Sequence, residues 1–190
     1  MRRLLFAVLV LLLGCSAPSS PPQFIGTDVT GAKIGADFTL SDHNGKPRHL
    51  SDFKGKVTML FFGYTHCPDA CPTTMGELAQ VAKLLGDKAK DLQVVFITLD
   101  PERDSAEILK QYVPSFNPDF LGLRGDPAST QKVAQDFKIF YAKQASNSKA
   151  GYTLDHSTGI YVYDKQGQLR LFLANTQKVQ DMAHDVGLLM

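Results

Sequence analysis

The chain has no tryptophan, only three cysteines among its 190 residues, and no dominant sign of charge. Its 20 Lys and Arg balance 19 Asp and Glu, which leaves a formal net charge of +1 at pH 7. No basic stripe runs along the sequence, so we expect no nucleic-acid partner. Twelve Phe still permit an aromatic core. The length is enough for one domain with a hydrophobic core and too short for two domains of ordinary size.

The chain also lacks an apolar run of the roughly 20 residues that a membrane span needs. Its longest run, Leu4–Leu13, follows two Arg and has the length of a signal-peptide core. The Leu-Leu-Gly-Cys that ends this run is similar to a bacterial lipoprotein box, which is cleaved before its Cys and lipidated on the sulfur. An uncleaved anchor is the alternative, and it is disfavoured because the run stops at Cys15.

We therefore predict three segments. Residues 1–14 are a lipoprotein signal peptide, residues 15–23 are a Ser- and Pro-rich tether with lipid on Cys15, and residues 24–190 are the folded domain. The protein is then exported, faces the periplasm and is held at the membrane by its lipid. With Cys15 lipidated, the other two cysteines form a neighbouring pair in an oxidising compartment.

Two apolar runs predict the centre of the fold. Residues 57–64 and 94–99 are typical of parallel strands that are buried on both faces. The segment between them has one apolar face at helical spacing, formed by Met75, Leu78, Ala79, Ala82 and Leu85. This strand–helix–strand unit predicts an α/β fold, a mixed sheet with helices on both faces.

Turn and capping signals predict the other elements. The expected hairpins join 37–40 to 47–50, at the N-terminal end of the domain, and 160–163 to 169–173. The expected helix starts are Asp104, with Glu107 completing a capping box, Asp126, with Pro127 in the first turn, and Thr176. Residues 138–157 are polar and predict a long exposed loop before the C-terminal hairpin.

The pair Cys67 and Cys71 lies between the first apolar run and the helix that follows it, where open α/β sheets place their sites. A nearby helix start favours thiolates, which are both metal ligands and redox nucleophiles. On a regular helix, residues four apart have Cβ atoms about 5–6 Å apart, wider than the roughly 3.5–4.5 Å of an unstrained disulfide. A metal ion bridges that gap, but Pro68 and Pro72 permit an irregular turn, so a disulfide stays open.

His156 is the third candidate ligand. It ends the polar segment and precedes a strand predicted to join the same sheet, and Asp155 beside it is a candidate to orient its ring. The alternative is an ordinary loop histidine. Two thiolates and one imidazole suit copper(I), copper(II) with one further ligand, and zinc, so the donor types alone do not separate these metals.

At these residues the sequence resembles the Sco/SenC family of membrane-tethered copper proteins, which have a thioredoxin-like fold. Three segments carry the resemblance in order. Residues 63–72 hold Cys-x-x-x-Cys, residues 96–104 read Phe-Ile-Thr-Leu-Asp-Pro-Glu-Arg-Asp, and residues 155–157 read Asp-His-Ser. The resemblance spans roughly Phe38 to the C-terminus, nearly the whole predicted domain, and three motifs in the right order make it more specific than the cysteine pair alone.

The resemblance implies that Cys67, Cys71 and His156 bind copper. It implies that the protein delivers copper to the binuclear copper centre of cytochrome c oxidase subunit II, or matures that centre, and another copper enzyme is the alternative partner. It also implies that Asp100 lies near the metal, behind the ligands or at a docking surface. A turn residue before Pro101 is the other interpretation of Asp100.

Thiol chemistry remains the competing function. In a thiol–disulfide reductase, one of the two cysteines attacks and the other resolves, and the histidine is not needed. The substrate would be the copper-binding cysteines of the same target. The sequence does not decide whether the protein is an enzyme. A peroxiredoxin-like peroxidase is disfavoured because no Pro and Thr precede Cys67 at the required spacing.

Overall fold

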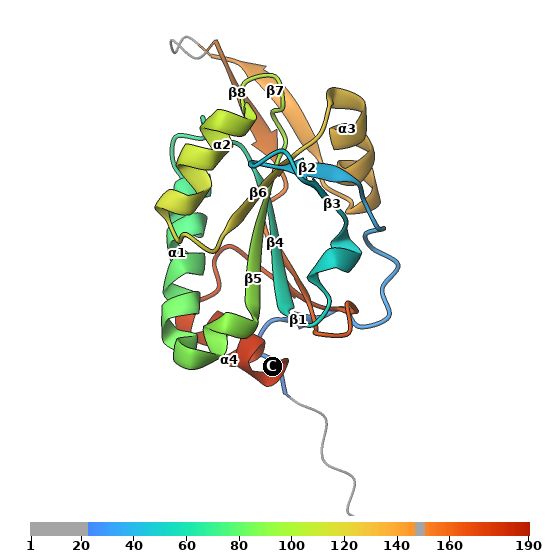
Figure 1. The fold of residues 1–190 in the computed structure, drawn as a ribbon. Helices are drawn as coiled ribbons and strands as arrows, with labels where there is room; N and C mark the ends of the chain where they lie inside the picture. The colour runs from blue at the N-terminus through green and yellow to red at the C-terminus, as the bar shows by residue number, and fades with distance from the viewer. Residues whose placement is uncertain (1–22, 147–150) are drawn as a thin grey trace, which may run out of the picture.

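The structure, a computed structural model, describes residues 23–146 and 151–190. Within them, eight strands form one mixed sheet in the order β1-β10-β9-β4-β5-β6-β2-β3, and β7 and β8 form a separate two-stranded sheet (Figure 1). The strands are β1 Thr27–Asp28, β2 Leu40–Asp42, β3 Pro47–Arg48, β4 Val57–Gly63, β5 Leu92–Thr98, β6 Leu121–Arg124, β7 Tyr141–Ala145, β8 Tyr152–His156, β9 Ile160–Tyr163 and β10 Leu169–Leu173. The α-helices are α1 Ala70–Leu85, α2 Ala106–Tyr112, α3 Pro127–Asp136 and α4 Val179–Leu188, and short 3₁₀ helices cover Leu50–Phe53, Gly86–Asp91 and Val113–Ser115.

The central pair β4 and β5 confirms the two predicted parallel strands. Their register runs from Val57 opposite Leu92 to Gly63 opposite Thr98, and all seven residues of β4 are buried. β9 pairs with the other side of β4 in the antiparallel direction. A strand with neighbours on both sides and protein on both faces needs an unbroken apolar sequence, which explains the run at residues 57–63.

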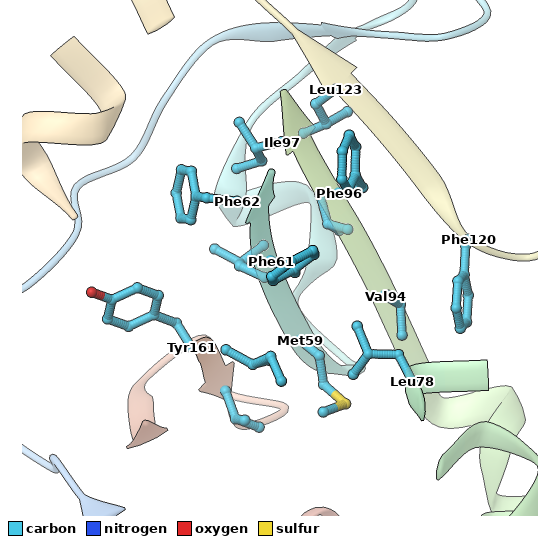
Figure 2. Close-up of a cluster of buried hydrophobic side chains, with 14 of the residues drawn as sticks. Met59, Phe61, Phe62, Leu78, Val94, Phe96, Ile97, Phe120, Leu123 and Tyr161 are labelled. Atoms are coloured by element: carbon cyan, nitrogen blue, oxygen red, sulfur yellow. The ribbon is translucent and has the colours of Figure 1, made fainter. Parts of the chain in front are cut away.

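Side chains of β4 alternate between two halves of the core (Figure 2). The Phe61 ring lies 6.0 Å from that of Phe96, on the side covered by α1. The Phe62 ring points the other way and lies 5.1 Å from Phe137, the residue that ends α3. Helices α1 and α4 pack on the first face and α3 lies over the second (Figure 1). The predicted mixed sheet with helices on both faces is confirmed.

Both predicted hairpins are present. β9 and β10 have the predicted bounds, and Asp164 Oδ1 accepts hydrogen bonds from two backbone N–H groups of their turn. The N-terminal hairpin differs from the prediction of 37–40 with 47–50: its strands are Leu40–Asp42 and Pro47–Arg48, and Asp42 Oδ1 accepts two backbone N–H bonds within its turn. Helix α3 starts as predicted, with Asp126 accepting from the N–H of Ser129, whereas α4 starts three residues after Thr176.

Two predictions were wrong. Asp104 does not cap α2, because Ser105 Oγ accepts the capping bond from the N–H of Ile108. The segment 138–157 is not a long loop, because β7 and β8 pair from Tyr141 opposite His156 to Ala145 opposite Tyr152. The prediction also missed β6, a four-residue strand that pairs in parallel with β5 and antiparallel with β2.

No helix in the described ranges is both long enough and apolar enough to cross a membrane. The predicted signal peptide at 1–14, the lipidation site Cys15 and nearly all of the tether lie outside the described residues.

Candidate metal centre

The loop that carries the two cysteines leaves the carboxyl end of β4 and enters α1 at Ala70. Cys71 is fully buried in the first turn of α1, and Cys67 is half-buried in the loop. The N–H of Cys71 points at Cys67 Sγ at 3.4 Å. Both are free thiols. The helix start therefore directs one backbone N–H toward the more accessible sulfur, as the sequence predicts for a thiolate-stabilising site.

Gly63, the last residue of β4, makes room for the buried thiol. A Cβ atom at this position would lie 2.9 Å from Cys71 Sγ and 3.0 Å from the ring of Phe96. Side chains do not approach a sulfur that closely, so any larger residue at Gly63 would push Cys71 out of place. The strand end is thus a recess whose shape is set by the absence of a side chain.

His156 reaches this recess from the end of β8. Its Nε2 lies 3.6 Å from Cys71 Sγ, although the two residues are 85 positions apart in the sequence. Its Nδ1 lies 2.8 Å from the backbone carbonyl of Ser157, and a carbonyl can only accept, so Nδ1 carries the hydrogen. In the neutral ring the lone pair is then on Nε2, which faces the sulfur. The ring of Tyr64, buried beside it, makes an edge contact with the imidazole.

The spacing of this pair fits a shared metal ion. For bond lengths of roughly 2.3 Å to sulfur and 2.0 Å to nitrogen, angles between tetrahedral and trigonal place the two donors about 3.5–3.7 Å apart. Even so, within 23–146 and 151–190 no three His, Cys, Asp or Glu side chains are already arranged to hold a metal ion. Two donors are at coordination spacing, and Cys67 Sγ would have to move to complete the set.

The two sulfurs have opposite protonation preferences. A hydrogen bond from Cys71, with further bonds from the backbone N–H groups of Asp69 and Cys71, lowers the pKa of Cys67 to about 3 against the effect of burial. The same bond to Cys67, together with burial, raises the pKa of Cys71. The pair therefore holds one proton at neutral pH, a thiolate on Cys67 and a thiol on Cys71 that donates to it.

Asp155 does not orient the histidine. The Ser157 carbonyl bonds the ring nitrogen instead, and Asp155 is exposed on β8 opposite Ala142. This corrects the predicted role of Asp155. His66, the other histidine near the cysteines, is exposed and lies 3.6 Å from Asp104 Oδ1.

Asp100 lies behind the hairpin that carries His156. Its carboxylate accepts bonds from Arg103 Nε at 2.5 Å and from the hydroxyl of Tyr152 at 2.7 Å. Asp104, which sequence reasoning took for a helix cap, is fully buried and accepts bonds from Thr65 and Thr98. The missed signal was local: Ser105, directly after Asp104, is an equally good N-cap and leaves the aspartate free for another role.

The protein is a thioredoxin-like α/β domain with two thiols after its central strand β4 and a histidine from β8 that faces them. These features define a class of candidate soft-metal or redox proteins. The sequence profile of the SCO1/SenC family matches residues 27–190, so the chain belongs to this family. A SCO2-like protein of Rickettsia prowazekii is 38% identical over 164 residues, which are 84% of this chain and 79% of that protein.

Solved structures agree. The chain is 38% identical to the copper-bound ScoI of Bradyrhizobium japonicum, with a TM-score of 0.76 and coverage of 83% of this chain and 99% of that one. BsSco, described as having a disulfide switch and as a member of the Sco family of cytochrome c oxidase assembly proteins, is 21% identical with a TM-score of 0.66 over 86% of this chain and 96% of that one. The second likeness supports the fold alone.

Proposed function

We propose that this protein binds copper through Cys67, Cys71 and His156, and that it delivers the ion to, or matures, the binuclear copper centre of cytochrome c oxidase subunit II. The observation that carries the proposal is the approach of His156 Nε2 to Cys71 Sγ at 3.6 Å with the ring hydrogen on the other nitrogen. In the metal-free protein the Cys71 thiol can donate to this lone pair, and a copper ion would take the place of that hydrogen between the same two atoms.

Copper is favoured over zinc by two arguments. Two sulfurs and one imidazole suit copper(I), and copper leads the affinity series of divalent metals for such donors. The ScoI relative of Bradyrhizobium japonicum, 38% identical, holds copper in its solved structure.

The thiolate on Cys67 is ready to bind the ion without losing a proton, whereas Cys71 must release a proton when the ion enters.

The proposed location is the outer face of a membrane, with residues 1–14 removed and lipid on Cys15. The tether joins the domain at the edge strand β1, and β10 and β9 separate that edge from β4. At a strand spacing of 4.7–4.9 Å, β1 lies about 14 Å from β4, at the level of Met59 and Leu60 and not at the carboxyl end that carries the cysteine loop. Asp185 of α4 accepts bonds from the N–H groups of Ile25 and Gly26, so the tether meets the domain at a fixed point.

The test is a copper(I) titration of the reduced full-length protein against a chromophoric chelator. We expect one equivalent bound, with X-ray absorption showing two sulfurs and one nitrogen around copper. His156→Ala should weaken binding at least tenfold, and His184→Ala, an exposed histidine of α4, should not. Equal affinity of His156→Ala and the natural protein would refute the three-ligand assignment.

A thiol–disulfide reductase is the second candidate, and the split protonation of the two sulfurs favours it. An accessible thiolate at Cys67 with a buried thiol at Cys71 is the arrangement of an attacking and a resolving cysteine. This function needs both cysteines and not His156. Oxidase assembly in cells that carry only His156→Ala would therefore favour the reductase, and loss of assembly would favour copper delivery.

A further inference from the structure

The loop between β5 and α2, residues 100–104, contacts both halves of the candidate metal centre. We propose that this loop is a positioning element, in which Asp104 fixes the cysteine loop while Asp100 and Arg103 fix the hairpin that carries His156. The inference rests on the proposed copper site and adds residues that do not touch the ion. Its sequence, Asp-Pro-Glu-Arg-Asp, places the two carboxylates four residues apart.

Asp104 holds the cysteine half. Its side chain is fully buried, and it accepts bonds from the backbone N–H and hydroxyl of Thr65 and from the hydroxyl of Thr98. Thr65 precedes Cys67 by two residues, and Thr98 ends β5. A buried carboxylate with three donors is a strong, directional contact, since hydrogen bonds to a charged group exceed neutral ones. Asp104 thus joins the start of the cysteine loop to the sheet.

Asp100 and Arg103 hold the histidine half through Tyr152, the first residue of β8. The Tyr152 hydroxyl donates to Asp100 Oδ1 at 2.7 Å, and Arg103 Nη1 donates to the Tyr152 carbonyl at 2.9 Å. The Arg103 guanidinium also lies 3.6 Å from the centre of the Tyr152 ring. An exposed ion pair between Lys143 of β7 and Glu102 adds a weaker link.

These contacts matter because the hairpin has a sheet of its own. β7 and β8 pair only with each other in the described part of the chain. Backbone hydrogen bonds to the eight-stranded sheet therefore do not fix the position of this hairpin. An isolated two-stranded hairpin is marginal in water. Tyr152, Leu154 and His156 share one face of β8 because strand side chains alternate. Fixing Tyr152 against the loop therefore sets the direction in which His156 points.

The test is a double-mutant cycle on copper(I) affinity with Tyr152→Phe and His156→Ala. Tyr152→Phe removes one hydroxyl and keeps the ring under Arg103. We expect it to weaken binding roughly 3- to 10-fold in the natural background, the size of one hydrogen bond to a charged group partly replaced by water. In the His156→Ala background it should have no effect, since the histidine is the group it positions. Tyr141→Phe, on the paired strand, is the matched control.

The cysteine half is tested with Thr65→Val, which removes one donor to Asp104. Its loss of copper affinity should persist in the His156→Ala background, because it acts through the sulfurs. The inference is overturned if Tyr152→Phe weakens binding equally in both backgrounds or in neither, or if Thr65→Val leaves affinity unchanged. If the natural protein binds no copper through sulfur, the proposed function fails instead, and the two failures are distinguishable.

Discussion

Replacing Gly63 with alanine tests whether the recess at the end of β4 exists to seat a sulfur. The added Cβ would lie 2.9 Å from Cys71 Sγ, 3.0 Å from Phe96 and 3.2 Å from Phe61, all in the packed core. Neither ring lies at the end of a flexible chain, so the sulfur has to move. Adding a methyl group to such a core costs about 1–3 kcal/mol.

A chain of this size loses about 2–4 °C in melting temperature per kcal/mol, so Gly63→Ala should lower the melting temperature by about 2–12 °C. The displaced sulfur should also weaken copper(I) binding. Gly76→Ala is the matched control, because Gly76 lies within α1 and a Cβ there meets nothing within 4 Å. Helix propensity predicts that this control stabilises the protein by about 0.5–1 kcal/mol.

Circular dichroism melts of the copper-free protein and chelator titrations of both variants provide the measurements. A Gly63→Ala protein with unchanged melting temperature and unchanged copper affinity would show that the strand end is not tightly packed around Cys71. A large loss of stability with unchanged affinity would separate packing from coordination, and would refute the argument that Gly63 serves the sulfur.

Three further predictions concern single contacts. Alkylation of Cys67 by iodoacetamide should keep a nearly constant rate from pH 5 to pH 8, because its pKa of about 3 leaves it ionised throughout, whereas an ordinary thiol slows about tenfold per pH unit below 8.5. In Cys71→Ser the plateau should begin at higher pH, and a pH-dependent rate in the natural protein would contradict the assignment of the thiolate. Asp126→Ala should cost about 0.5–2 kcal/mol in denaturant unfolding through the lost cap of α3, with copper affinity unchanged. Phe137→Ala should cost about 3–5 kcal/mol, since the ring contacts three other aromatic rings, those of Phe38, Phe62 and Tyr161.

The centre of the fold was predictable because its signals are local. An apolar run that fills β4, and a 3.6-residue period in α1, can each be recognised without knowing what they contact. The hairpin of β7 and β8 was missed for the opposite reason. Tyr141–Ala145 is half-exposed to exposed along its length, and its strand state depends on its pairing with Tyr152–His156. A short polar strand off the main sheet leaves no periodic apolar pattern.

The residues of the site also divide into those with a local sequence signal and those without one. Cys67 and Cys71 follow a buried strand, so their position was evident. His156 was a candidate from its place at the end of the polar segment, and the resemblance of residues 155–157 added to that expectation. The orienting partner of His156 was mistaken because a carboxylate next in sequence looked sufficient. In a strand, neighbouring side chains point to opposite faces, so Asp155 faces solvent when His156 faces the sulfurs. The carbonyl of Ser157 remained as the acceptor for Nδ1.

The geometry around Cys71 also helps to distinguish copper delivery from thiol–disulfide exchange. Disulfide exchange needs an accessible attacking thiolate and a nearby thiol, and Cys67 with Cys71 supplies both without help. It does not require the imidazole nitrogen that lies 3.6 Å from the buried sulfur, where in the metal-free protein it can accept a hydrogen bond from the Cys71 thiol. A soft cation between the two atoms accounts for both the spacing and the tautomer. Replacing His156 with glutamine, which keeps a polar side chain but no ring nitrogen, should therefore leave the alkylation of Cys67 fast while weakening copper binding, and equal losses of both would favour a redox role for the histidine.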